Sequence, residues 1–185
     1  TADVIENQYA KIIEKVIANT NIPIAVKLGT FFTDMAHFMV KLSWKKLGGI
    51  VLFNRSLSPD ININKQTLIG TNVFSHPEDI TLPLRWIGLL SDKVHTDLCS
   101  STGVHDGEGV VKMLLVGAKA VQVVSVLYKK GIGEISKMNA FLNEWMDKNN
   151  YKCIDDFRGK MSYKSHSSPA GYERVQFMKY YSGIE

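Results

Sequence analysis

Four short apolar runs, each ending in a polar or small residue, alternate along this chain with segments of helical spacing. The runs cover 23–28, 49–54, 94–101 and 120–125. Alternation of this kind predicts an α/β protein with a parallel sheet, in which binding residues collect at the carboxyl ends of the strands. The candidate functional residues are therefore those at or just after the ends of the runs, namely Lys27, Asn54, Ser101, Thr102, Gly103 and Ser125.

The segments between the runs have helix signals. Seven apolar residues at helical spacing predict a first helix that Asp3 caps and that reaches about Asn19. Thr33 and Asp106 are the expected caps of two later helices. The stretch after Asn54 is longer than a usual βα loop of roughly 2–6 residues, and its alternating segment 61–64 predicts a short ribbon.

Composition narrows the class of protein. The chain has 185 residues with 45% hydrophobic and 22% charged residues, which suits one globular domain. The net charge of +4 comes from scattered cations, so we expect no nucleic-acid partner. No apolar stretch approaches 18 residues, so we expect no membrane span. The start at Thr1, with no initiator Met, is expected to be internal.

Cysteines and histidines give no sign of a metal or a disulfide. Cys99 and Cys153 lie far apart without metal spacing, so we expect free thiols in a reducing compartment and a cytoplasmic protein. The five histidines lack the HExxH pattern and paired-ligand spacing, so no metal site is predicted.

Two architectures fit four βα units. One is half of a TIM (β/α)8 barrel, consisting of strands 5 to 8 with flanking helices, and the other is an open doubly wound sheet of four strands. Composition does not separate them. Beyond residue 161 the chain is rich in Ser, Pro and Gly, which predicts a linker at 162–171 and a final helix at 172–181.

The residues alone favour a site for an anionic ligand. Lys27 suits an anion or an electron-rich ring, or is a lysine at the rim of the sheet. Asn54 has the donor and acceptor for an amide or carboxylate, or forms a turn. The hydroxyls of Ser101 and Thr102, followed by a helix, suit a phosphate. This signal is weak, because the chain has no GxGxxG and no P-loop.

Five motifs have a specific order and spacing. They are IPIAVKL (22–28), IVLFNR (50–55) with PDI (59–61) beyond it, LPLRWI (82–87), STGVH (101–105) and DFRGKM (156–161). Across about residues 3–161 this pattern resembles the C-terminal half of the dihydroorotate dehydrogenase family, in particular its dihydroorotate dehydrogenase-like subgroup. The segment 173–179 also fits that subgroup.

The resemblance implies a fold and a set of roles. Residues 1–161 would be strands 5 to 8 of an FMN-binding barrel, and 162–185 a linker with a helical tail. Lys27 would contact the flavin ring and Asn54 the pyrimidine substrate, while Ser101, Thr102, Gly103, Val124 and Ser125 would form the two loops that hold the FMN phosphate. The family's catalytic Cys or Ser base belongs to the other half, so no catalytic residue is expected in this chain.

Three departures from the family pattern bear on function. Thr102-Gly103 stands where the family has Gly-Gly, and Val124-Ser125 where it has Gly-Thr. Arg55 replaces a small serine beside the substrate asparagine, so we expect it to exclude or reorient dihydroorotate while still admitting an acidic substrate.

The resemblance therefore implies an FMN-dependent oxidoreductase of pyrimidine biosynthesis that oxidises dihydroorotate or a related acid. Its expected partners are a small-molecule substrate and either the N-terminal half of the barrel or a second copy of the chain. The alternative is a non-catalytic flavin- or phosphate-binding half-barrel module or pseudoenzyme.

Overall fold

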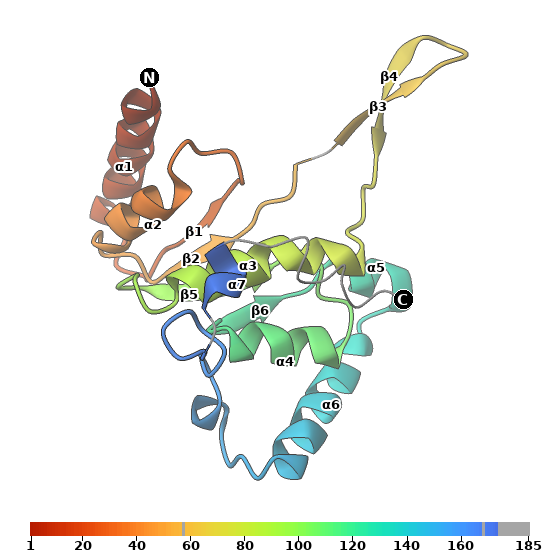
Figure 1. The fold of residues 1–185 in the computed structure, drawn as a ribbon. Helices are drawn as coiled ribbons and strands as arrows, with labels where there is room; N and C mark the ends of the chain where they lie inside the picture. Colours follow the sequence, from red (N-terminus) through yellow and green to blue (C-terminus); the bar gives the residue numbers. More distant parts are fainter. Residues whose placement is uncertain (57, 168, 174–185) are drawn as a thin grey trace.

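The computed structural model describes residues 1–56, 58–167 and 169–173 (Figure 1). The elements in chain order are α1 (Ala2–Ala18), β1 (Ala25–Leu28), α2 (Met35–Ser43), β2 (Gly49–Leu52), β3 (Ser58–Asn62), β4 (Thr67–Thr71), the 3-10 helix η1 (Pro77–Ile80), α3 (Thr81–Leu90), β5 (Asp97–Ser101), α4 (Gly107–Leu115), β6 (Ala120–Gln122), α5 (Ser125–Lys130), α6 (Glu134–Lys148), the 3-10 helix η2 (Ile154–Asp156) and α7 (Ala170–Glu173).

The main sheet has the order β1-β2-β5-β6, and all three neighbouring pairs are parallel. This confirms the α/β fold with a parallel sheet predicted from the four apolar runs. Each strand is shorter than its run: β2 ends at Leu52 and β6 at Gln122. The polar residues that follow the strands therefore lie in loops at the carboxyl edge.

The two faces of this sheet differ. Ile50, Leu52 and Leu98 point to one face, where they are at most 2% exposed and belong to one core with residues of α2, α3 and α4. Alternate residues of the edge strands β1 and β6 are exposed, among them Lys27 and Gln122. Because successive strand residues point to opposite faces, the burial pattern leaves one face open at the edge strands.

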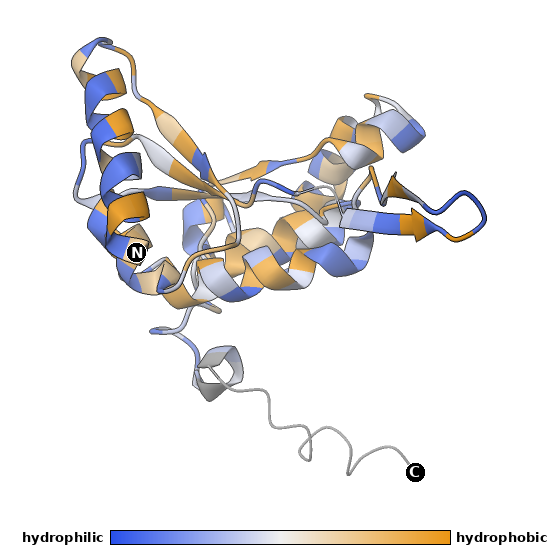
Figure 2. Ribbon diagram, turned by 90° about the horizontal axis from the view of Figure 1, so that it is seen from above, coloured by the Kyte–Doolittle hydropathy of each residue, from blue (hydrophilic) through white to orange (hydrophobic). Residues whose placement is uncertain are grey.

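Helix α1 buries only part of its apolar stripe. Ile13 is 5% exposed and Tyr9 packs edge-on against the rings of Phe32 and Phe38. Ile12, in contrast, is 57% exposed, and Figure 2 shows hydrophobic (orange) and hydrophilic (blue) residues along α1. The predicted apolar stripe is therefore only partly buried, because the aromatic cluster covers only one side of the helix.

Two expected helix caps are corrected. Thr1 flanks α1, and Asp3, the expected cap, lies inside its first turn. Asp34 rather than Thr33 caps α2, since its Oδ1 accepts a hydrogen bond of 3.0 Å from the backbone N–H of His37. Both carboxylates favour the positive N-terminal end of a helix, but only Asp34 precedes its helix.

The expected ribbon is an antiparallel hairpin. Strands β3 and β4 pair from Ser58↔Thr71 to Asn62↔Thr67, and the hairpin projects from the body in Figure 1. The Oδ1 atom of Asn62 accepts the N–H groups of Asn64 and Lys65, which closes the tip. We call residues 72–76, which lead from this hairpin back to the sheet, the return arm.

The segment after residue 161 lies against α3. The N–H of Tyr163 donates to the carbonyl of Gly88 at 2.8 Å, and Ser162 is fully buried. Of the predicted final helix at 172–181, residues 174–181 lie outside the described residues, and the domain boundary near 161 stays a prediction. Within the described ranges, none of the helices is long and apolar enough to cross a membrane.

Candidate functional site

The carboxyl edge of the main sheet contains a cavity of about 270 Å³. All eight residues that the sequence singled out line it, and these are Lys27, Asn54, Arg55, Ser101, Thr102, Gly103, Val124 and Ser125. The parallel strands bring them together because each strand ends at the same edge. Gln122 and Ser75 also line the cavity, and the sequence had pointed to neither.

The ammonium group of Lys27 is hydrogen bonded to side chains of two other strands of the main sheet. Its Nζ donates to Ser101 Oγ at 2.9 Å and to Gln122 Oε1 at 3.2 Å. Ser101 and Gln122 are register partners on β5 and β6, whereas Lys27 comes from β1. The lysine therefore reaches over the sheet toward the far strand, which does not fit a lysine at the rim of the sheet.

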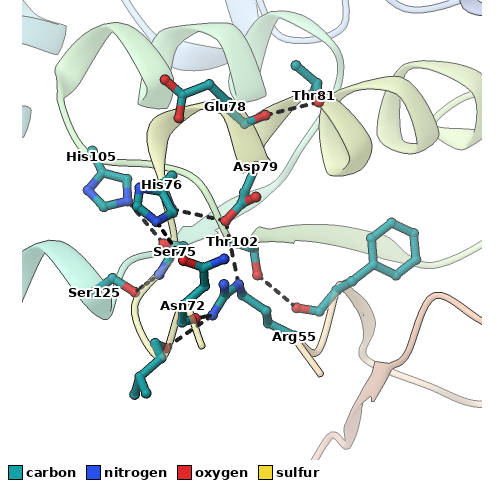
Figure 3. A network of polar contacts seen from close by, with 12 residues as sticks. Arg55, Asn72, Ser75, His76, Glu78, Asp79, Thr81, Thr102, His105 and Ser125 are labelled. Carbon is teal, nitrogen blue, oxygen red and sulfur yellow. Dashed lines mark hydrogen bonds and ion pairs between the residues drawn. The ribbon is translucent and has the colours of Figure 1, made fainter. Parts of the chain in front are cut away.

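Asn54 and Arg55 leave the second strand together. The Asn54 N–H donates to the carbonyl of Leu28, which fixes the start of the loop. The Nε of Arg55 lies 3.5 Å from Asp79 Oδ2, and its Nη1 donates to the carbonyls of Asn72 and Val73 (Figure 3). The ion-pair partner of Arg55 is thus Asp79 of η1.

Thr102 and Gly103 make a tight turn after β5. Their φ angles are 89° and 80°, in the region that side chains with a β-branch rarely adopt. The Thr102 hydroxyl donates to the carbonyl of Phe53 at 3.2 Å, which offsets part of the cost. A Cβ on Gly103 would lie 2.1 Å from the backbone nitrogen of Ile80. Only glycine fits between the turn and η1.

Helix α4 starts beside this turn, as predicted. The carboxylate of Asp106 accepts a hydrogen bond of 2.8 Å from the N–H of Gly109, so Asp106 is its N-cap. Of this segment, the turn residues Thr102, Gly103 and Val104 line the cavity. Backbone donors of this kind suit an anion.

A buried cluster joins the return arm to the cavity wall (Figure 3). The Ser75 N–H donates to Ser125 Oγ at 2.9 Å, and Ser75 Oγ is hydrogen bonded to His105 Nε2 at 3.0 Å. Lys129 Nζ donates to the Ser75 carbonyl at 3.0 Å. Burial lowers the pKa of His105, and the charges of Lys129 and Lys130 lower it further. The imidazole is therefore neutral at pH 7.

A second cavity of about 630 Å³ adjoins the first. It shares Asn54, Arg55 and Thr102 with the first cavity and adds apolar walls from Phe31, Phe53 and Leu82. Sites for organic ligands typically have about 300–1,000 Å³ with few polar groups. The two cavities together therefore have the size and the mixture of polar and apolar walls of a site for an organic ligand.

The donor set fits FMN and gives no indication of a metal. Lys27 offers a cation, Asn54 and Gln122 offer amides, and Ser125 offers a hydroxyl. Groups of this kind suit a flavin ring and a phosphate. Among the described residues, no group of three His, Cys, Asp or Glu side chains could hold a metal ion.

The fold and the cavity thus define an α/β protein with a ligand site at the carboxyl edge of a parallel sheet. Comparison with known proteins shows what the chain is similar to. The chain is 30% identical over 147 residues to dihydroorotate dehydrogenase B (NAD(+)), catalytic subunit, of Saccharolobus solfataricus, covering 78% of the chain and 50% of the relative. It is 24% identical over 172 residues to a probable dihydroorotate dehydrogenase A (fumarate) of Streptococcus pneumoniae, covering 83% and 52%.

A shorter match and a solved structure agree with these relatives. Over 60 residues the chain is 38% identical to dihydroorotate dehydrogenase (fumarate) of Lachancea kluyveri, covering 32% of the chain and 19% of the relative. The structure of DHODH from Eimeria tenella in complex with ferulenol has a TM-score of 0.60 at 16% identity, covering 73% of the chain and 37% of that structure. No family model matches the chain.

These matches confirm the resemblance: the chain is dihydroorotate dehydrogenase-like over about four fifths of its length. The chain spans about half the length of these longer relatives. The structural likeness concerns the fold alone.

Proposed function

We propose that residues 1–161 are strands 5 to 8 of a (β/α)8 barrel that binds FMN, with 162–185 as a linker and tail. The complete protein would be an FMN-dependent oxidoreductase that oxidises dihydroorotate or a related acidic substrate in pyrimidine biosynthesis. The observation that carries this proposal is the convergence on one cavity of the eight residues that stand at the family's binding positions.

The half-barrel is supported by the sheet and by α1. Four parallel strands in sequential order, with one face open at the edge strands, are what half of a barrel presents. Ile5, Ile12 and Val16 of α1 are 44–57% exposed, and such apolar residues favour a partner surface. The proposed partner is the N-terminal half of the barrel, or a second copy of this chain.

Each residue of the cavity has a proposed role. Lys27 would bind the flavin ring, and Ser101, Thr102, Gly103, Val124 and Ser125 would bind the phosphate. Asn54 would orient the substrate through its amide, and Arg55 beside it would favour a carboxylate-bearing substrate. FMN, when bound, supplies a two-electron acceptor for the substrate. The base that removes the substrate's proton would come from outside this chain.

The alternative function is a flavin- or phosphate-binding module without catalysis. The turn after β5 favours it, because Thr102 holds a strained φ of 89° where the family has glycine. Val124, 57% exposed, adds an apolar side chain to the second phosphate loop. The free thiols of Cys99 and Cys153 support the cytoplasmic location that is part of both proposals.

The test is to purify the complete protein that contains this chain and record its absorbance. A flavin spectrum, with FMN released on denaturation, is expected, and turnover of dihydroorotate or another acid would follow as flavin reduction. Absence of flavin, with no quenching of added FMN fluorescence, would overturn the proposal. Bound FMN without reduction by any acid tested would favour the module.

A further inference from the structure

The acceptors that hold the Lys27 ammonium group are both neutral. They are the hydroxyl of Ser101 at 2.9 Å and the side-chain amide of Gln122 at 3.2 Å. Among the described residues, no carboxylate lies within ion-pair distance of Lys27. The cavity floor therefore keeps an uncompensated positive charge.

Gln122 is placed to fix this charge. It is the register partner of Ser101, so its amide and the Ser101 hydroxyl stand side by side on β6 and β5. Lys27 lies on β1, with β2 and β5 between it and β6. A lysine side chain has many rotamers, and it stays extended across two strands only where acceptors hold its end.

The identity of the residue at 122 matters because of its charge. Glutamate has nearly the same shape, and at 3.2 Å from Nζ its carboxylate would form an ion pair with Lys27. Asp97 lies on the same face of the sheet as Lys27, but nearer the amino ends of the strands. It is in register with Gly49, whereas Lys27 is in register with Val51 and, through Val51, with Cys99. Glutamine thus supplies an acceptor without cancelling the charge.

We propose that Gln122 is a positioning residue, which fixes the Lys27 ammonium in the cavity and leaves its charge available to an anionic or electron-rich group of the ligand. That the ligand is FMN rests on the proposed function. The placement of Lys27 by Gln122 does not, and it can be measured without ligand.

The first experiment measures acylation of Lys27 by acetic anhydride, followed by mass spectrometry, in the full chain and in Gln122→Met and Gln122→Glu. Acylation requires the side chain to leave its acceptors. We expect Lys27 to react about tenfold faster in Gln122→Met, which is about 1.4 kcal/mol for one lost charge-assisted hydrogen bond. It should react more slowly in Gln122→Glu. Lys65 at the hairpin tip is the internal control and should not change.

The second experiment measures FMN affinity of the complete protein by fluorescence quenching. Gln122→Glu should weaken FMN binding about tenfold, equivalent to about 1.4 kcal/mol, and the same substitution in a Lys27→Met background should have less than a twofold effect. Equal effects in both backgrounds, or Lys27 acylation unchanged by either substitution, would overturn the role of Gln122. If the unsubstituted protein binds no FMN, the proposed function fails and acylation alone decides the role of Gln122.

Discussion

Ser75 and His105 meet at 3.0 Å between Oγ and Nε2, although 30 residues separate them in the chain. Ser75 belongs to the return arm, and His105 belongs to the turn that leads into α4. Both are buried, at 6% and 8% exposed. Their contact, with the bonds from Ser75 to Ser125 and Lys129, ties the long excursion after β2 to the loops of the proposed phosphate site.

The burial of His105 beside two lysines makes stability depend on pH. Burial, with the charges of Lys129 and Lys130, lowers the pKa of His105 below its ordinary value of 6.5. As pH falls below 6.5, the unfolded chain binds a proton at this residue while the folded chain stays neutral, so the free energy of unfolding decreases. The decrease ends once pH is below the folded-state pKa. Urea unfolding between pH 7.5 and pH 5 should show it.

His105→Gln should remove this part of the pH dependence while keeping a polar partner for Ser75. His37→Gln is the matched control, because His37 is exposed on α2. The variant of His37 should keep the dependence of the unsubstituted chain. Identical pH profiles for His105→Gln and the unsubstituted chain would contradict the assignment to His105.

The turn at Gly103 should not tolerate any side chain. In Gly103→Ala the new Cβ would lie 2.1 Å from Ile80 N and 2.6 Å from Asp79 C, both backbone atoms that cannot move alone. We expect a loss of about 4 kcal/mol or more, the range of the most severe single substitutions. Thermal unfolding measures it, and η1 should separate from the β5 turn.

Gly131→Ala separates the free-energy cost of the steric clash from the cost of the backbone conformation. Gly131 has a φ of 88°, close to that of Gly103, but nothing lies within 4 Å of its Cβ position. Its ψ of 168° lies in a region that is essentially restricted to glycine, so the substitution should cost only the conformational part, about 1–3 kcal/mol. Similar losses for the two variants would show that the contact with η1 does not matter.

The sequence predicts the parallel sheet and the residues that line the cavity, and the reason is physical. Apolar runs specify strands, and parallel strands bring their ends to one edge whatever the loops do. Lys27, Asn54, Ser101 and Ser125 therefore meet as predicted. The same argument does not apply to α1, because periodicity gives the apolar side of a helix but not what covers it.

Contacts between distant side chains were beyond sequence reasoning. Gln122 reaches Lys27 across 95 residues, and Ser75 reaches Ser125 across 50. The first contact depends on the rotamers of two strand side chains, and the second on the path of the return arm, which has no periodic pattern. Gln122 stands in the fourth apolar run, two residues before Val124, so its place near the carboxyl end of a strand was a signal that could have pointed to it. Ser75 gave none.

FMN should bind weakly to residues 1–185 alone. The proposed ring site has a wall on one side only, and the open sheet face around Lys27 and Gln122 stays in contact with water. Fluorescence quenching should give a Kd at least about a hundredfold weaker than for the complete protein, equivalent to about 2.7 kcal/mol. Tight one-to-one binding by residues 1–185 would show that this chain holds a complete site.

Arg55 should act on the substrate and on the return arm, and one substitution tests both. Arg55→Ser removes the hydrogen bonds to the carbonyls of Asn72 and Val73 and the ion pair with Asp79. Limited proteolysis should then cut the hairpin and arm several-fold faster, since each lost charged hydrogen bond contributes about 1–3 kcal/mol. Lys65→Ser at the hairpin tip is the control and should be cut at the unsubstituted rate.

The effect of Arg55 on substrate choice is measured on the complete protein. Serine restores the small hydroxyl of the family, so Arg55→Ser should raise kcat/KM for dihydroorotate relative to other acids. Arg55→Lys should not, because lysine keeps a long, positively charged side chain at the position where the family has a small hydroxyl. If dihydroorotate oxidation is already efficient and Arg55→Ser leaves it unchanged while the arm loosens, Arg55 holds the arm in place and does not set specificity.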